Sequence, residues 1–166
     1  MHVTFGPKGV VQIDNARITY RNFSGAGSKF NREGDRNFAV IIPDSDIADA
    51  LVDEGWAVKI KPPREEGDSP FMFLKVKVLF KTRANGELTP NIYLVSNGNQ
   101  VKLDEESVNC LDNIDIQNVD LDIRPYDWEV NGKTGRSAYL HAMRVTQEID
   151  RFATRFTDDY SDEVPF

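Results

Sequence analysis

The sequence has little of what several classes of protein require. Cys110 is the only cysteine in 166 residues, so no internal disulfide can form, which is typical of proteins from a reducing cytoplasm. Neither of the two histidines has metal-ligand spacing. No apolar run approaches the ~20 residues of a membrane helix, and no signal-peptide pattern follows Met1. We therefore expect a cytoplasmic protein with no metal site and no membrane partner.

Signatures of enzymes are also missing. Residues 132–134 read Gly-Lys-Thr, but a phosphate-binding loop needs a glycine at position 127, where Asp127 stands. No Asp-x-Lys or Glu-x-Lys occurs, so the commonest carboxylate-lysine nuclease core is absent. No nucleophile is paired with a base in any recognisable pattern. We expect no cofactor and no enzymatic activity.

Positive charge is in the minority, and its distribution is uneven. The chain has 20 Lys and Arg against 27 Asp and Glu, a net charge of −7, which by itself argues against a nucleic-acid partner. However, residues 1–103 carry 14 basic and 12 acidic side chains, whereas residues 104–166 carry 6 and 15. The Debye length is ~8 Å in physiological salt, far less than the width of such a domain. An acidic side therefore does not cancel a basic side.

Alternating and β-branched segments predict a mainly β fold. Three Asn-Gly dipeptides, at 85–86, 97–98 and 131–132, are typical of hairpin turns. The predicted strands are Val10–Phe23, Arg36–Ile42, Trp56–Lys61, Phe71–Lys81, Ile92–Val95, Ile114–Arg124, Tyr126–Val130 and Ala138–Thr146. The apolar phase slips inside the first and the sixth of these, which predicts β-bulges that help a small barrel to close. The fold class expected is a bulged antiparallel barrel with extra hairpins.

One helix and a tail complete the predicted organisation. Ser45 can cap a helix that ends at Gly55 and plugs one end of the barrel. A second, short amphipathic helix is expected at Ile149–Phe156. The acidic residues that follow have too little apolar surface to fold alone, so a disordered tail is expected. The predicted division is one domain over 1–148 and an amphipathic segment with an acidic tail over 149–166.

The segment Phe71–Lys81 (FMFLKVKVLFK) carries the clearest functional pattern. Period two places Met72, Leu74, Val76, Val78 and Phe80 on one face, and Phe71, Phe73, Lys75, Lys77, Leu79 and Lys81 on the other. The first face is suited to a core. Rings and ammonium groups on the second face suit the unstacked bases and phosphates of single-stranded nucleic acid. An edge strand protected by lysines would give the same pattern.

Two further segments, 16–38 and 56–61, repeat this arrangement, and two hairpins add polar tips. The candidate nucleic-acid-binding residues are Arg17, Arg21, Phe23, Lys29, Phe30, Arg32, Arg36, Lys59, Lys61, Phe71, Phe73, Lys75, Lys77, Lys81, Tyr93, Lys133 and Arg136. Tyr20 is expected on the core face with Ile18. Trp56, Tyr126 and Trp128 are in phase with apolar neighbours, and a core position is expected for them.

The stretch 104–122 holds seven carboxylates and no basic residue. Clustered carboxylates can hold divalent cations, so a metal-dependent nuclease using the cluster Asp112–Asp122 is one alternative. The more ordinary interpretation is a solvated outer face.

The last five residues, Asp162-Glu163-Val164-Pro165-Phe166, together with the predicted barrel, plug helix and basic aromatic groove, resemble single-stranded DNA-binding proteins of the OB-fold type. In the bacterial members, aspartates precede Ile-Pro-Phe at the terminus, and Val164 here replaces the isoleucine. The predicted helix follows the second strand, and the strands are more numerous than in the bacterial family. The resemblance is therefore to a bacteriophage-encoded member.

This resemblance implies a protein that coats single-stranded DNA, without strong sequence preference, during replication, recombination and repair in the host cytoplasm. It implies that the tail docks on a polymerase, helicase or primase, recombinase or nuclease through Asp158, Asp159, Asp162, Glu163, Val164, Pro165 and Phe166. A homodimer is compatible with the sequence. An RNA-binding OB-fold module and an acidic mimic of DNA stay open as alternatives.

Overall fold

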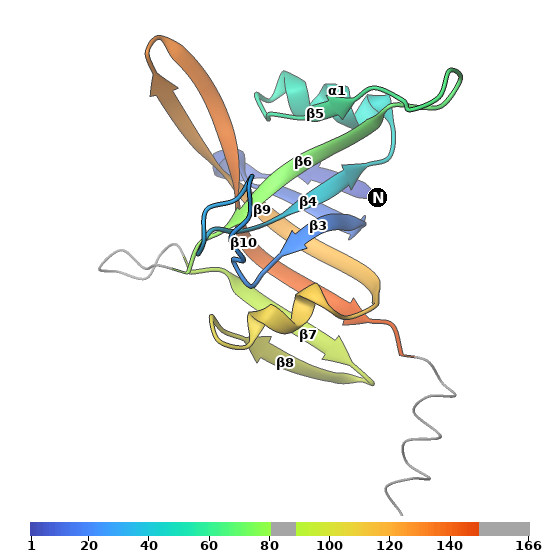
Figure 1. The fold of residues 1–166 in the computed structure, drawn as a ribbon, viewed down its shortest axis with the longest axis vertical. Coiled ribbons are helices and arrows are strands. Elements are labelled where there is room, and N and C mark those ends of the chain that lie inside the picture. Colours follow the sequence, from blue (N-terminus) through green and yellow to red (C-terminus); the bar gives the residue numbers. More distant parts are fainter. Residues whose placement is uncertain (81–88, 150–166) are drawn as a thin grey trace, which may run out of the picture.

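The computed structural model describes residues 1–80 and 89–149, and shows a strongly curved β-sheet around one hydrophobic core (Figure 1). In chain order the elements are β1 (His2–Phe5), the 3-10 turn η1 (Pro7–Gly9), β2 (Val11–Ala16), β3 (Ile18–Asn22), β4 (Arg36–Ile42), α1 (Ser45–Asp53), β5 (Lys59–Lys61), β6 (Phe71–Val78), β7 (Asn91–Ser96), β8 (Asn99–Leu103), the 3-10 turn η2 (Val108–Asp112), β9 (Ile116–Val130) and β10 (Lys133–Gln147). The predicted mainly β class is confirmed. Within these two ranges, no helix has the length and apolarity needed to cross a membrane.

The sheet closes on itself as a barrel. β2 and β3 are separated only by Arg17, and this bent ribbon pairs with β9 at one end and with β4 at the other. From β4 the ring continues through β6 and β10 back to β9. This is the five-stranded Greek-key barrel of an OB fold. All pairings in the ring are antiparallel except that of β6 with β10, which is parallel.

Bulges occur where the apolar phase slips. The predicted strand Val10–Phe23 is divided into β2 and β3, and the register shifts between Ile13 and Ala16 and again between Thr19 and Asn22. Asn15 and Tyr20, with φ of 54° and 50°, supply the left-handed backbone at these two points. A third shift lies between Ile116 and Asn118 of β9. The predicted bulges are therefore confirmed, and they bend the ribbon enough to close the ring.

Several strand boundaries differ from the prediction. The segments Ile114–Arg124 and Tyr126–Val130 form one strand, β9, that runs through Pro125. Proline is tolerated there because β9 pairs with β2 only as far as Ile123 and has β10 alone beyond it. The short edge strands β1 and β8 were not predicted, and β5 is only three residues long. The turns at 97–98 and 131–132 are confirmed by the hairpins they join.

Helix α1 covers one end of the barrel, as predicted. Its N-cap is Asp44 rather than Ser45, because the Asp44 carboxylate accepts the Ile47 N–H at 2.9 Å. Leu51 is fully buried in the core, and Gly55 turns the chain away with a φ of 94°. The predicted second helix, the acidic tail, Lys81 and the turn at 85–86 lie outside the described residues, and the boundary at residue 148 stays a prediction.

Candidate nucleic-acid interface

Strand β6 divides its side chains between the core and solvent as predicted. Leu74, Val76 and Val78 are buried, whereas Lys75 and Lys77 are exposed. β6 lies between β4 and β10, and its first residues also pair with β5. In that pairing, Lys59 lies opposite Phe73 and Lys61 lies opposite Phe71. Cross-strand partners share a face. The lysines of two strands therefore meet the two rings on one outer surface of the barrel.

Three rings gather at one end of this surface. The Tyr20 ring contacts those of Phe71 and Phe73 edge-on, with centroids 6.2 and 5.6 Å apart. Lys61 covers the cluster, since its Nζ lies 5.0 Å from the Tyr20 centroid and donates to the Tyr20 hydroxyl at 3.1 Å. Phe73 is only 9% exposed because these neighbours cover it, although it lies outside the main core.

The prediction that Tyr20 lies on the core face is wrong. The bulge at its left-handed backbone turns the side chain outward, and 54% of it is exposed.

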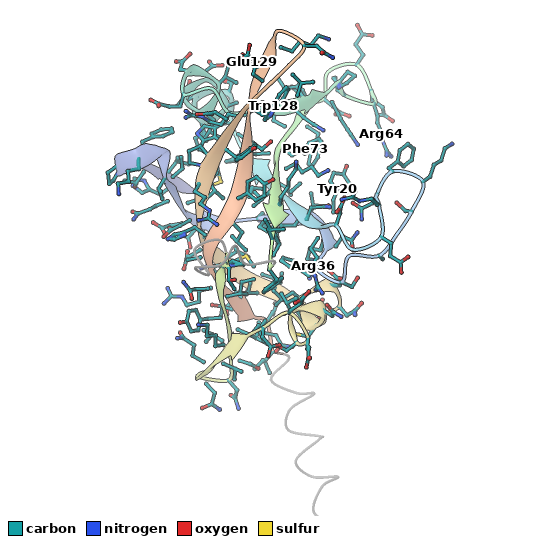
Figure 2. All side chains as sticks on the ribbon, turned by 90° about the vertical axis from the view of Figure 1, so that its left-hand side faces the viewer. Tyr20, Arg36, Arg64, Phe73, Trp128 and Glu129 are labelled. Carbon is teal, nitrogen blue, oxygen red and sulfur yellow. The ribbon has the colours of Figure 1, made fainter. Side chains whose placement is uncertain are left out.

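We call the surface formed by Lys59, Lys61, Lys75, Lys77, Tyr20, Phe71 and Phe73 the basic face. Figure 2 shows Phe73 between Trp128 and Tyr20 in this view, with Arg64 of the β5–β6 loop nearby. Arg64 was not among the predicted site residues.

Among the residues that the structure describes, no acidic side chain forms an ion pair with the four lysines of the basic face. The ion pairs found in residues 1–80 and 89–149 join Arg32 to Asp35, Arg136 to Asp127 and Arg144 to Asp120. None of them involves Lys59, Lys61, Lys75 or Lys77. Unpaired ammonium groups beside exposed rings provide what a single strand needs, namely contacts for phosphates and platforms for bases.

Two adjoining hollows extend the basic face, and both are lined by Lys75 and Lys77. The first, of about 280 Å³, reaches Arg32, Arg36, Asn37 and Tyr139. The second, of about 290 Å³, reaches Lys59, Trp128, Arg136 and Ser137. Together they form a track from the loop at 24–35, across β6, to the β9–β10 hairpin. The face of the second and third barrel strands and the loops beside it are where OB folds bind oligonucleotides.

The loop at 24–35 holds a ring in solvent. The Asn31 side-chain amide donates to the carbonyls of Ala26 and Asp35 at 2.9 and 3.0 Å, and its oxygen accepts from Asn37. This network fixes the loop, while Phe30 at its tip is 90% exposed. The Lys29 Nζ lies 5.7 Å from the Phe30 ring centroid. The loop thus presents the Phe30 ring and the Lys29 ammonium group together, so both of these predicted site residues are accessible to a ligand.

The β9–β10 hairpin carries rings that sequence reasoning placed in the core. Tyr126 and Trp128 are 53% and 38% exposed, because the hairpin extends beyond the closed barrel (Figure 1). Tyr126 contacts Tyr139 edge-on at 5.9 Å, and the Lys77 Nζ lies 5.8 Å from the Tyr139 ring centroid. The sequence held one signal of this exposure. The turn at 131–132 places Trp128 opposite Gly135, which has no side chain to cover the ring. Trp56, in contrast, is buried as predicted.

Several predicted site residues have structural positions instead. Phe23 is a correction, because it is fully buried and stacks on Phe38 at 5.1 Å, so its ring cannot reach nucleic acid. Arg21 donates to the carbonyls of Leu111 and Ile114, both at 2.8 Å, and holds the η2 segment against the barrel. Both residues are therefore removed from the candidate interface.

The remaining basic candidates vary in availability. Arg36 donates to the Phe23 carbonyl and to Asn109, but it also lines the first hollow. Lys133 is exposed at the start of β10, next to the hairpin turn. Arg17 is exposed but lines a different hollow, with Ile116 and Glu148, so the structure does not join it to the basic face.

Tyr93 lies in acidic surroundings. It shares a shallow hollow with Asp14, Asp120, Asp122 and Arg144. We call this surface the acidic face. Nothing in this hollow resembles the unpaired lysines of β5 and β6, since its one cation, Arg144, is paired with Asp120 at 3.1 Å. The structure therefore separates Tyr93 from the other aromatic candidates.

The carboxylates of the chain's acidic stretch serve structural purposes. Asp112 accepts the N–H groups of Phe23 and Ser24 at 2.7 and 3.0 Å. Asp104 accepts from Ser107, and this bond lowers the pKa of the Asp104 carboxyl. Across the described ranges, no group of three or more His, Cys, Asp or Glu is placed to hold a metal ion. The alternative of a metal-dependent nuclease thus gains no support from the arrangement.

Asp120 and Asp122 have pKa values shifted in opposite directions. Burial alone would raise the pKa of Asp120, but the Asn15 N–H and Arg144 together lower it below the ordinary value. Burial raises the pKa of Asp122; nearby His141 opposes this in part, and Asp14 adds a smaller rise. The first carboxylate is stabilised by its partners, whereas the second is held charged at a cost.

Comparisons with known proteins bear on the fold and on the family. The structure resembles the single-stranded DNA-binding protein from bacteriophage Enc34 in complex with ssDNA, with a TM-score of 0.54 and 14% identity over 90% of this chain and 93% of that one. A C-terminally truncated form of the same phage protein gives a TM-score of 0.54 at 11% identity, over 87% and 88% of the two chains. No curated protein matches the sequence.

At these identities the structural likeness establishes the fold alone. The family assignment comes from the sequence, because residues 3–164 match the model of the family described as "Putative phage ssDNA-binding domain". That match spans nearly the whole chain and confirms the resemblance to phage single-stranded DNA-binding proteins, whereas the likeness of the last five residues to the bacterial terminus stays a prediction. The chain therefore belongs to this family of phage single-stranded-DNA-binding domains.

Proposed function

We propose that the protein binds and coats single-stranded DNA without strong sequence preference, as a non-enzymatic component of phage replication and recombination in the host cytoplasm. The observation that carries the proposal is the basic face on an OB barrel, where four lysines with no ion-pair partner among the described residues lie beside a ring cluster in which Tyr20 is 54% exposed. Rings and ammonium groups recognise features common to all nucleotides, which explains the expected lack of sequence preference.

The family and one structural neighbour favour DNA over RNA as the ligand. The family is described as binding ssDNA, and the Enc34 protein was solved in complex with ssDNA. The two binding hollows do not themselves distinguish the sugars. Matched DNA and RNA oligonucleotides therefore form part of the test, and tighter binding of RNA would overturn the choice of DNA.

The direct test is a fluorescence titration with a thymidine homopolymer at several salt concentrations. Trp128 is 38% exposed beside the lysines and Trp56 is 3% exposed, so quenching on binding should come from Trp128. Lys75→Ala should weaken binding and lower the salt slope by ~0.7, the value of one phosphate contact on a single strand. Lys102→Ala on β8 is the matched control. Equal loss in the control, or no binding by the unmodified protein, contradicts the proposal.

We further propose that residues 158–166 recruit replication and recombination enzymes. Support comes from the sequence alone: four carboxylates precede a terminal Val-Pro-Phe. Burying one phenylalanine contributes ~1.5–3 kcal/mol, whereas micromolar binding needs ~8 kcal/mol. Charge-assisted contacts, or many tails on one coated strand, must supply the difference. Deleting residues 158–166 should abolish capture of a purified partner enzyme and leave DNA affinity equal or higher, and a loss of DNA affinity would count against this assignment.

A further inference from the structure

The β9–β10 hairpin extends beyond the barrel, where paired strands have no support from the sheet. β10 pairs with β6 at Ala138 but not at the residues before it, which lead to the hairpin turn. Residues 126–137 therefore have only each other as strand partners. A two-stranded ribbon of this kind is marginally stable by itself. Trp128, at the middle of the ribbon, lines the second hollow beside Lys59 and Lys75. The position of Trp128 therefore depends on the contacts that hold the ribbon against the barrel and on those that hold the ring against the ribbon.

Arg136 ties the ribbon to the end of α1. Its guanidinium forms two hydrogen bonds with Asp127 across the hairpin, at 2.7 and 3.1 Å. The same group donates to the Glu54 carbonyl at the helix C-terminus, at 2.8 Å, and lies 5.5 Å from the Trp56 ring centroid. Only 24% of the Arg136 side chain is exposed. A guanidinium engaged on three sides has little left for a phosphate.

Gly135 provides the space that the Trp128 ring occupies. The two residues are cross-strand partners. A Cβ at Gly135 would fall on the indole ring, closer than van der Waals contact permits, and none of the nearest atoms to it is backbone. Gly135 is not among the glycines with positive φ, so an alanine strains no backbone and only displaces the ring. From this position the indole also lines the second hollow.

From these contacts we infer that Gly135 and Arg136 are positioning residues for Trp128, which is a base-stacking platform that no family match assigns. Arg136 fixes the hairpin against α1, and Gly135 lets the indole lie on the hairpin. This inference rests on the proposed binding of single-stranded DNA. It changes the role of Arg136, which the sequence pattern had presented as a phosphate contact.

Two variants test the assignment without removing the ring. Gly135→Ala and Arg136→Lys should each weaken binding of a thymidine homopolymer by about fivefold or more, a substantial part of one stacking contact. Lysine keeps the charge but cannot bridge Asp127 and the Glu54 carbonyl in the same fork. The salt slope should stay unchanged in both, because no phosphate contact is lost. Thr134→Ala, whose side chain is on the opposite hairpin face from Gly135, is the control.

A double-mutant cycle then decides whether the two residues act through the ring. In a Trp128→Ala background, Gly135→Ala and Arg136→Lys should cause no further loss of affinity. Full additivity, or unchanged affinity in the single variants, overturns the inference. If the Arg136→Lys variant binds as tightly as the unmodified protein, Arg136 is no positioning residue. If Arg136→Ala lowers the salt slope, Arg136 is a phosphate contact instead.

A measurement without DNA separates this inference from the proposed function. Trp56 is buried, so acrylamide quenching reports mainly on Trp128. Gly135→Ala should increase the quenching constant, while Thr134→Ala should not; Arg136→Lys is left out of this comparison because Arg136 also contacts the Trp56 ring. If the unmodified protein fails to bind DNA but this increase occurs, the proposed function fails and the positioning contact of Gly135 stands. If binding occurs but the increase does not, the positioning inference fails alone.

Discussion

The outer surface of one barrel carries two faces that differ in how their charges are used. On the basic face, Lys59, Lys61, Lys75 and Lys77 have no ion-pair partner among the described residues and lie beside rings. On the acidic face, Arg144 is paired with Asp120, and Tyr93 lies among carboxylates. Strand β10 reaches both surfaces, because Tyr139 lines the first hollow beside the basic face and Arg144 lines the acidic face, with a register shift between Leu140 and Ala142 separating them.

This difference shows that an aromatic residue on a strand does not by itself indicate a nucleic-acid site. Tyr93 and Tyr139 are both partly exposed tyrosines on the outside of the sheet. Only Tyr139 has an unpaired cation over its ring, at 5.8 Å from Lys77. Because phosphates accompany every base, a ring among carboxylates is a poor platform for DNA. The charges around a ring decide what it can bind.

The largest expected effect comes from reversing the charge of the basic face. Lys75→Glu with Lys77→Glu should weaken binding of single-stranded DNA by about 100-fold or more in ~0.1 M salt, because two phosphate contacts become repulsions. The measurement is an anisotropy titration. Lys102→Glu, on β8, should change affinity by less than about twofold, since it adds only screened negative charge. Comparable losses in both would remove the distinction between the faces.

A smaller effect is expected from removing one ring, and it should differ between Trp128, beside the basic face, and Tyr93, on the acidic face. Trp128→Ala should cost about one stacking contact, ~1–3 kcal/mol or at least fivefold in affinity. Tyr93→Ala should leave affinity unchanged, because Tyr93 lies on the acidic face. Isothermal titration with the same oligonucleotide compares the two. A loss on Tyr93→Ala that matches the loss on Trp128→Ala would contradict the account.

On the acidic face, Asp120→Ala should affect stability rather than binding. It leaves the Asn15 N–H without its acceptor and breaks the pair with Arg144, at an expected cost of ~1 kcal/mol, or about 2–4 °C in Tm. Since its pKa is lowered in the folded state, this stabilisation is present above about pH 4 and is lost as the pH falls through the folded value. Magnesium-dependent DNA cleavage that disappears in Asp120→Ala would instead revive the nuclease alternative.

The smallest effect, of opposite sign, is expected at Asp122. Its pKa is raised by burial in the folded state, so its contribution to stability is present below its ordinary value and is lost as the pH rises through the folded value. Asp122→Asn removes this penalty, and we expect a small rise in Tm at pH 7 that vanishes near pH 3. Thermal scans at the two pH values check the sign. A lower Tm at pH 7 would show that Asp122 makes a contact that stabilises its charge.

Much of the fold could be predicted because its determinants are local. Period two in β6, the Asn-Gly turns at 97–98 and 131–132, and the phase slip before Ile18 each act within a few residues. The short strands β1 and β8 were missed because edge strands of four or five residues carry little pattern. The parallel pairing of β6 with β10 depends on how the ring closes, which no local signal records.

The site was predicted where side-chain direction followed strand period and missed where it did not. Tyr20 faces outward because a left-handed residue reverses the alternation, and Phe23 is buried after the same bulge. Trp128 is exposed because its strand extends beyond the barrel, although its phase relative to Val130 is as predicted. Arg136 is of a residue type that often contacts phosphate, but it is paired with Asp127 across the hairpin, and only the strand register reveals this contact.

The most direct test of the distinction between the faces is ultraviolet cross-linking of a bound thymidine homopolymer, with the adducts located by mass spectrometry. We predict adducts at Trp128 and Tyr139 and in the peptide that holds Phe71 and Phe73, with none at Tyr93. Adducts concentrated at Tyr93, with the peptides of β6 and the β9–β10 hairpin unmodified, would contradict it.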